Sequence, residues 1–162
     1  PPNSLLAYRR EFEDLARDPV RRLRTHRALE QLSVFGVDAA PTLLHLVDSA
    51  CALKEESEDE SSSRAKRSRG DEDWQSLYRS GLLGLCRLGG EASPALAPLM
   101  ERLRNGTLPL RGANRELIVT TLVRLGVDPG HLRSHYVGEA SPIDGERFDR
   151  IVERARTRPD CS

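Results

Sequence analysis

The chain has 162 residues, which is enough for one compact domain that buries roughly two thirds of its unfolded surface. Apolar residues make up 38% and aromatic residues only 4%, so the core must be mainly aliphatic, and this composition favours helices over a β-sandwich. The 25 basic and 25 acidic residues cancel, which excludes binding of nucleic acid through an overall positive charge.

Three helices are predicted before the first long polar run. Apolar residues at steps of three and four define an opening helix over about 5–15, and the Asp-Pro pair at 18–19 then supplies a cap and a first-turn proline. A second helix follows, and Gly36 offers the left-handed conformation that ends helices. The third, over about 43–50, is apolar around much of its circumference, so we expect it to be the most buried.

The segment from Lys54 to Asp73 differs from the rest of the chain in composition. It carries eight acidic and five basic residues, and Ala65 is its single apolar residue. Such a stretch has too little apolar side chain to offset the entropy cost of ordering. A flexible charged loop is therefore predicted over about 54–72.

Helical periodicity resumes at Trp74 and continues towards the C-terminus. Gly and Pro mark the predicted boundaries, with stops at Gly89-Gly90, Asn105-Gly106 and Gly126, and starts at Ser93-Pro94, Asp128-Pro129 and Ser141-Pro142. The helix that starts at Asp128-Pro129 is short and is expected to reach Tyr136. Together with the first three, these segments predict an all-α chain of about eight helices.

The sequence also repeats itself. Aligning Gly36 with Gly89 superposes Pro41 on Pro94 together with the leucines around them, and aligning Gly36 with Gly126 gives a third copy in which Gly-Val-Asp recurs. The first spacing of 53 residues (89 − 36) is long for a two-helix repeat. Removing about 16 residues of the charged loop restores a period of roughly 40, in the range of helical repeats.

These motifs resemble a HEAT repeat. The resemblance is carried by Asp-Pro-Val-Arg at 18–21, Ala-Ala-Pro-Thr-Leu-Leu at 39–44 and LGGEASPAL at 88–96, and it covers about residues 15–137. The second copy departs from the family pattern, since Trp74 stands where its arginine would be. The resemblance implies antiparallel hairpins stacked in an α-α superhelix, here a single domain over 1–162. It also implies a scaffold or adaptor, because HEAT-like arrays generally bind proteins.

A partner surface is predicted at Trp74 and at four arginines of the N-terminal region, Arg21, Arg22, Arg24 and Arg27. Arginine favours bidentate contacts with phosphate, so a nucleic-acid-binding helical repeat that uses this cluster is the alternative to a protein scaffold. Acidic neighbours at 11–18 dilute the positive field.

The charged loop is interpreted either as a solvated insertion without a role or as a regulatory segment. Serines beside acidic residues are typical of acid-directed phosphorylation, and the basic run RAKRSR resembles a nuclear-import or phosphate-binding element. The regulatory residues would be Ser61, Ser62, Ser63, Arg64, Lys66, Arg67 and Arg69.

No pattern predicts catalysis, a metal or a cofactor. His131 and His135 have the spacing of a zinc pair but lack nearby further ligands, so surface histidines are expected.

Cys51, Cys86 and Cys161 are odd in number and form no CxxC pair, which predicts an intracellular setting, cytoplasmic or nuclear. Cys51 and Cys86 are expected to be small core residues, and Cys161 to lie near a frayed end. No apolar run approaches the ~20 residues that span a bilayer. Because the chain lacks an initiator Met, we expect it to be part of a longer protein.

Overall fold

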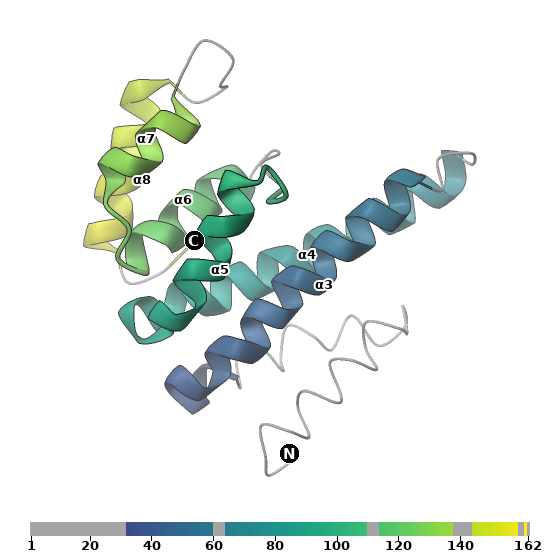
Figure 1. Ribbon diagram of the computed structural model, residues 1–162, viewed down its shortest axis with the longest axis horizontal. Coiled ribbons are helices and arrows are strands. Elements are labelled where there is room, and N and C mark those ends of the chain that lie inside the picture. Colours follow the sequence, from purple (N-terminus) through teal and green to yellow (C-terminus); the bar gives the residue numbers. More distant parts are fainter. Residues whose placement is uncertain (1–31, 60–63, 110–113, 138–143, 159–160, 162) are drawn as a thin grey trace. The chain divides into compact units, whose positions relative to one another are not determined.

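The computed structural model describes residues 32–59, 64–109, 114–137, 144–158 and 161 (Figure 1). Within these ranges every regular element is helical and no strand is present. In chain order the elements are the 3₁₀ helix η2 (Ser33–Ala39), α3 (Ala40–Asp59), α4 (Arg64–Leu88), the 3₁₀ helix η3 (Gly89–Ala95), α5 (Leu96–Arg104), α6 (Asn114–Arg124), α7 (Pro129–Tyr136) and α8 (Gly145–Thr157). The prediction of an all-α chain is confirmed for these residues.

The predicted number of about eight helices is not reached among the described residues, whose α-helices are α3 to α8. The predicted opening helix at 5–15 and almost all of the second helix lie outside the described ranges.

The chain groups into two compact units. Unit 1 ends at Gly84, and unit 2 runs from Leu85 to Ser162, so the boundary falls near the end of α4. A stack of repeats also divides in this way, because each repeat contacts only its neighbours. The single domain over 1–162 therefore stays a prediction.

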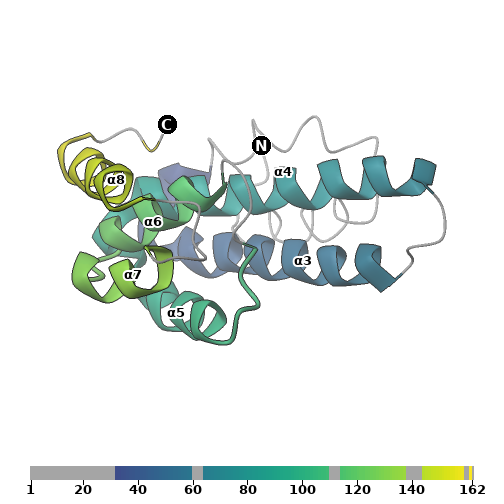
Figure 2. The same ribbon diagram turned by 90° about the horizontal axis from the view of Figure 1, so that it is seen from above.

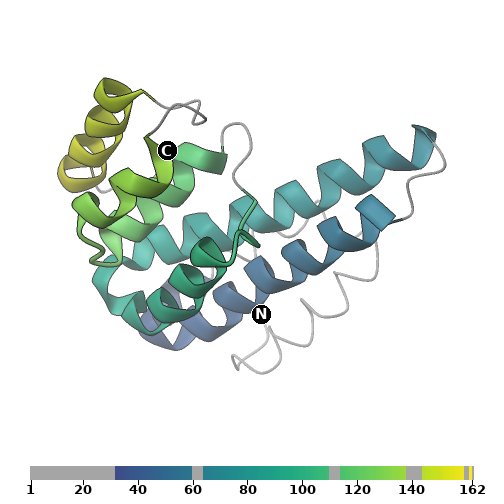
Figure 3. The same cartoon turned by 45° about the horizontal axis from the view of Figure 1, so that its top comes forward.

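In unit 1, α3 and α4 lie side by side (Figures 2 and 3). Two glycines of α4 allow the close approach. A Cβ placed on Gly81 would lie 2.8 Å from Val47 Cγ2 and 2.9 Å from the Leu43 carbonyl oxygen, and a Cβ on Gly84 would overlap the Leu43 side chain. The close packing of α3 against α4 therefore requires residues without a Cβ at Gly81 and Gly84.

Unit 1 has a mainly aliphatic core. Its buried apolar residues are Leu32, Ala39, Ala40, Leu43, Leu46, Val47, Ala50, Cys51, Trp74, Leu77, Tyr78 and Leu82. Trp74 and Tyr78 lie one helical turn apart, and their rings meet edge to face with centroids 6.1 Å apart. The two aromatic rings extend the aliphatic core along α4.

The predicted flexible loop at 54–72 is wrong for most of its length. Helix α3 continues to Asp59 and α4 begins at Arg64, while 60–63 lie outside the described residues. Lys, Glu, Arg and Ala all have high helix propensity, and extending a helix costs far less than nucleating one. A segment with few apolar residues has little reason to be buried, but its Lys, Glu, Arg and Ala residues still favour a helical backbone.

The three glycines that the sequence repeat aligns all have a positive φ. Gly36, Gly89 and Gly126 have φ values of 56°, 55° and 104°. Residues with a Cβ adopt a positive φ at a cost, so glycine suits the point where a helix ends. Gly36 has the positive φ that favours glycine, while its ψ of −136° lies outside the left-handed helical region, and the helix that it is predicted to end lies almost wholly outside the described residues. The 3₁₀ helices η2 and η3 lie at the first two of these joints.

In unit 2, α8 lies against α6 and α7 (Figure 1). The core of this unit includes the buried residues Leu99, Leu103, Leu108, Leu117, Ile118, Val119, Leu122, Leu125, Leu132, Tyr136, Phe148, Ile151, Val152 and Ala155. The Tyr136 and Phe148 rings stack with centroids 6.4 Å apart, which joins the end of α7 to the start of α8.

Two predicted helix starts in unit 2 have different outcomes. The helix from Asp128-Pro129 to Tyr136 is confirmed as α7, with Pro129 in its first turn. The last helix begins at Gly145 instead of at Ser141-Pro142, because Asp144 is its N-cap. The Asp144 carboxylate accepts a hydrogen bond of 2.7 Å from the backbone N–H of Arg147, which satisfies one of the unpaired donors of the first turn.

Candidate interaction surface on the last helix

Helix α8 carries one sequence triplet three times: an acidic residue, an arginine and an apolar residue. The copies are Glu146-Arg147-Phe148, Asp149-Arg150-Ile151 and Glu153-Arg154-Ala155, with Val152 inserted before the last. Each position of the triplet therefore recurs at i, i+3 and i+7, and residues at this spacing share one side of a helix. The result is an acidic row (Glu146, Asp149, Glu153), an arginine row (Arg147, Arg150, Arg154) and an apolar row (Phe148, Ile151, Ala155).

Burial separates the three rows. The members of the apolar row are between 1% and 3% exposed, whereas all six charged residues are exposed. Burying a large apolar side chain such as Phe148 or Ile151 contributes about 1.5–3 kcal/mol, which fixes the rotation of α8 against the rest of unit 2. Both charged rows must then face outward.

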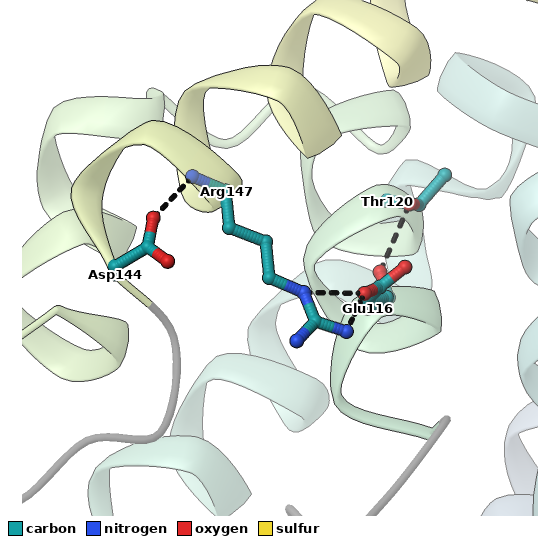
Figure 4. Close-up of polar contacts among 4 residues, drawn as sticks. All are labelled: Glu116, Thr120, Asp144 and Arg147. Atoms are coloured by element: carbon teal, nitrogen blue, oxygen red, sulfur yellow. Dashed lines mark hydrogen bonds and ion pairs between the residues drawn. The ribbon is translucent and has the colours of Figure 1, made fainter.

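Arg147 connects the start of the arginine row to α6. Its Nε donates a hydrogen bond of 2.9 Å to Glu116 Oε1, and its Nη2 contacts the same oxygen (Figure 4). The side chains are 53% and 33% exposed, so this ion pair contributes at most about 1 kcal/mol. The contact serves mainly to position α8.

Asp149 connects the acidic row to α7. It forms an ion pair with Arg133, whose guanidinium carbon also lies 5.8 Å from the centre of the Phe148 ring. Arg133 therefore combines an exposed ion pair with a cation–π contact, and each such contact is weak at an exposed site.

Arg150 and Arg154 have no carboxylate partner among the described residues. They lie four residues apart on one row, and like charges at that spacing destabilise a helix by a few tenths of a kcal/mol. Arg154 lies in the last turn, where the helix dipole favours a cation, whereas Arg150 lies in the middle of the helix, where Glu146 at i−4 and Glu153 at i+3 offer weak opposite-charge compensation. Outside α8, no ion pair among the described residues of unit 2 accounts for a cation at Arg150.

Comparison with protein-family models, with curated proteins and with solved structures finds no match to this chain. The surface is therefore judged by its own chemistry. Two parallel rows of opposite charge suit a partner that presents both signs in register, and protein surfaces do this through complementary charged side chains.

Most residues predicted to form a site fall outside the described part of the chain. Arg21, Arg22, Arg24 and Arg27 lie outside it, as do Ser61, Ser62 and Ser63. The backbone of Arg64, Lys66, Arg67 and Arg69 belongs to the first two turns of α4. The predicted regulatory basic run is therefore helical and not part of a loop.

Trp74, predicted as a partner contact, is only 4% exposed. It lies on α4 in contact with Tyr78, so its indole belongs to the core of unit 1 and offers no face to a partner. Trp74 and the leucines that follow it recur with helical spacing on one apolar stripe. This pattern predicts a buried position for Trp74, and the structure shows it buried.

Two cysteines behave differently from their prediction. Cys86 and Cys161 form a disulfide with their Cα atoms 6.1 Å apart, which lies within the usual range. Cys86 is a core residue as predicted, but it is paired, and Cys161 is buried instead of lying at a frayed end. The prediction of an intracellular setting used the odd number of cysteines and the absence of a CxxC pair as an argument against disulfides, and this disulfide weakens that argument. Cys51 is buried, as predicted.

Arg124 lies next to this disulfide. Its Nε donates a hydrogen bond of 2.9 Å to the Cys86 carbonyl oxygen, and its Nη1 donates one of 2.7 Å to the Arg158 carbonyl oxygen. These carbonyls belong to the last turn of α4 and to the residue that follows α8, where helices leave acceptors without intrahelical partners. One guanidinium therefore caps two helix ends.

The two histidines of α7 and Tyr136 are weak candidates for metal binding or acid–base catalysis. His131 and His135 are both exposed on α7, and the described residues hold no group of three potential metal ligands. Burial raises the pKa of the Tyr136 phenol far above its usual value, with a smaller opposing effect from Arg115, so it is a poor acid–base group. None of the helices in the described ranges is long and apolar enough to cross a membrane.

The rows of α8 were not identified from the sequence, although the signal is present. The acidic-Arg-apolar triplet is visible in the letters at 146–155 once its three copies are aligned. A search for an apolar stripe alone finds Phe148 and Ile151 but treats the charges between them as a solvated face.

Proposed function

We propose that this chain is a non-catalytic scaffold or adaptor domain that binds a protein partner, and that the two charged rows of α8 form the contact surface. The observation that carries the proposal is the separation of opposite charges into two parallel exposed rows on one helix. A nucleic-acid backbone would be repelled by the acidic row next to the arginines, whereas a protein can match both rows.

The charged residues of α8 that form no ion pair among the described residues define the expected contacts. Arg150 and Arg154 can each bind a partner carboxylate through two parallel hydrogen bonds. Glu146 and Glu153 can accept hydrogen bonds from lysines or arginines of the partner. Arg147 and Asp149 are already used by Glu116 and Arg133, so they hold the surface in place.

The proposal includes a HEAT-like stack of hairpins. The recurrence of glycines with positive φ at Gly36, Gly89 and Gly126 supports it, as does a 3₁₀ helix at the first two joints. Stacked hairpins bury one face of each helix pair and leave the other side as a continuous surface for partners. In this arrangement the chain supplies a rigid platform, and any chemistry belongs to the partner.

The proposal is tested by affinity capture from native lysate, with and without nuclease, at low and high salt. The unmodified chain is compared with the double charge reversal Arg150→Glu/Arg154→Glu. The matched control is Arg79→Glu/Arg104→Glu, which makes the same change of charge at two exposed arginines outside α8. We expect nuclease-resistant capture of a protein by the unmodified chain and by the control, and its loss with the α8 reversal.

Recovery of nucleic acid that vanishes with salt and does not respond to the α8 reversal would contradict the proposal. That result would instead favour the alternative, in which the arginine cluster at Arg21, Arg22, Arg24 and Arg27 binds phosphate.

A further inference from the structure

Helix α8 leaves four charged side chains exposed and without an ion pair among the described residues. Each charged row supplies two of them, and they are Glu146, Glu153, Arg150 and Arg154. The helix packs within unit 2 through its apolar row, which lies on the opposite side. The exposed face is therefore open to another helix and carries equal numbers of unpaired positive and negative charges.

The two charged rows lie on the two flanks of this face. Successive residues of a helix differ in direction by about 100°, so each arginine lies one step round the helix from the acidic residue before it. The apolar row lies one step further round and is buried. A line midway between the charged rows therefore points away from the core, with negative charge on one flank and positive charge on the other.

The symmetry of a pair decides which rows meet when this face contacts a second copy of itself. In a two-fold pair with antiparallel helices, each row faces the row of like charge. In a two-fold pair with parallel helices, the rotation exchanges the flanks, so the acidic row of each chain faces the arginine row of the other. Opposite charges attract in the parallel pair alone, so electrostatics selects that orientation.

The heights of the charges along the helix also match in the parallel pair. Each arginine of the row follows an acidic residue directly, as Arg154 follows Glu153. Adjacent residues of a helix differ in height by about 1.5 Å, which the long arginine side chain easily spans. Glu153 of one copy therefore lies within reach of Arg154 of the other, and the two-fold axis repeats this contact. The exposed face of α8 is complementary to itself.

We propose that the charged rows of α8 bind a second copy of the chain, with the two α8 helices parallel about a two-fold axis. This inference rests on the partner surface proposed above and names its occupant. Exposed ion pairs contribute little singly, so the pairing is reversible and weakens as salt screens the charges.

Sedimentation velocity of the whole chain, over a range of protein concentrations and at low and high ionic strength, tests the pairing. We expect a dimer at low salt that weakens at high salt. Arg150→Glu/Arg154→Glu makes the unpaired positions of both rows acidic, and Glu146→Arg/Glu153→Arg makes them basic. Each change should weaken self-association at least about tenfold, because like charges then face each other.

The matched control is Arg79→Glu/Arg104→Glu, which reverses two exposed arginines outside α8. Its self-association should stay within about threefold of that of the unmodified chain, because its rows are intact. Far-UV circular dichroism of every variant checks that the helices are kept.

Two rescue experiments make the test independent of a folding defect. The acidic and basic variants, mixed in equal amounts, should form a mixed dimer because opposite charges meet again. A variant that carries all four α8 substitutions exchanges the two rows. It should dimerise as the unmodified chain does, because the parallel pair stays complementary when both rows are exchanged.

The exchanged variant also separates this inference from the proposed function. A different protein partner would meet reversed charges on that variant and would lose binding, whereas a second copy would still bind. An unmodified chain that stays monomeric at all concentrations would overturn the self-pairing, and capture of a different protein through α8 would then leave the proposed function standing. A dimer that persists in both single-row reversals, or that the exchanged variant fails to form, would also overturn the self-pairing.

Discussion

Unit 1 and unit 2 are stabilised in different ways. In unit 1, the α3–α4 pair relies on close packing, with Gly81 and Gly84 leaving room for Leu43 and Val47. In unit 2, the buried core is supplemented by a disulfide, by Arg124 on two helix ends and by two exposed ion pairs. The long helices α3 and α4 bury much of each other's surface, whereas the short helix α7, of eight residues, gains from links between elements.

The comparison predicts the largest effect for the disulfide of unit 2. It closes a loop with a sequence separation of 75 residues, so reduction should lower the free energy of unfolding by about 4 kcal/mol in the chain-entropy account. Chemical denaturation with and without dithiothreitol measures this. The Cys86→Ser variant should show no response to the reductant, and an equal response in that variant would disprove the assignment.

The next largest effect is predicted in unit 1. Gly81→Val should cost about 3 kcal/mol, because its Cβ meets Val47 and the Leu43 backbone and α3 must move away. Trp74 is the single tryptophan of the chain and lies in unit 1, so its fluorescence follows this transition. Gly90→Ala is the control, since nothing lies within 4 Å of its added Cβ. A similar loss in the control would refute the close-packing account.

A smaller effect is predicted for Arg124. Arg124→Met keeps part of the aliphatic stem but removes both hydrogen bonds to the carbonyls of Cys86 and Arg158, so unit 2 should lose about 1–2 kcal/mol. Hydrogen exchange of α8 and of the end of α4 locates the change. Arg104→Met on α5 is a comparison from the same unit at an exposed arginine, and the account fails if Arg124→Met has no effect at either helix end.

The smallest effect is predicted for the ion pair that positions α8. Glu116→Gln should cost roughly 0.5 kcal/mol, because the pair with Arg147 is partly exposed and screened by salt. Denaturation at low and high ionic strength should bring the variant and the unmodified chain together as salt rises. A loss of several kcal/mol that persists in high salt would mean that the pair is part of the core.

Local features of this fold follow from the sequence. Gly126 ends a helix because few other residues tolerate a positive φ, and Asp128-Pro129 starts a helix because cap and proline both suit a first turn. Features that join distant residues do not follow in this way. The pairing of Cys86 with Cys161 spans 75 residues, and spacing alone cannot select it.

Three features that the sequence analysis does not predict correctly each have their own physical reason. The segment at 54–72 was judged by its lack of apolar residues, although helix propensity decides its backbone. Trp74 is predicted to contact a partner, whereas its position on the apolar stripe of α4 buries it. In α8 a search for apolar stripes alone passes over the charge pattern, because the positions of Arg150 and Arg154 form a row only when they are compared with the acidic and apolar rows beside them.

The central claim is that the charged rows of α8 form the partner surface. The most direct test is titration calorimetry of the captured protein with the unmodified chain, with Arg150→Glu/Arg154→Glu and with Arg79→Glu/Arg104→Glu. We expect the α8 reversal to weaken binding more than about a hundredfold and the control to stay within about threefold, since reversing two contacting charges replaces attraction by repulsion. Equal affinity of all three proteins would contradict the claim and would indicate that the partner binds to a part of the chain other than α8.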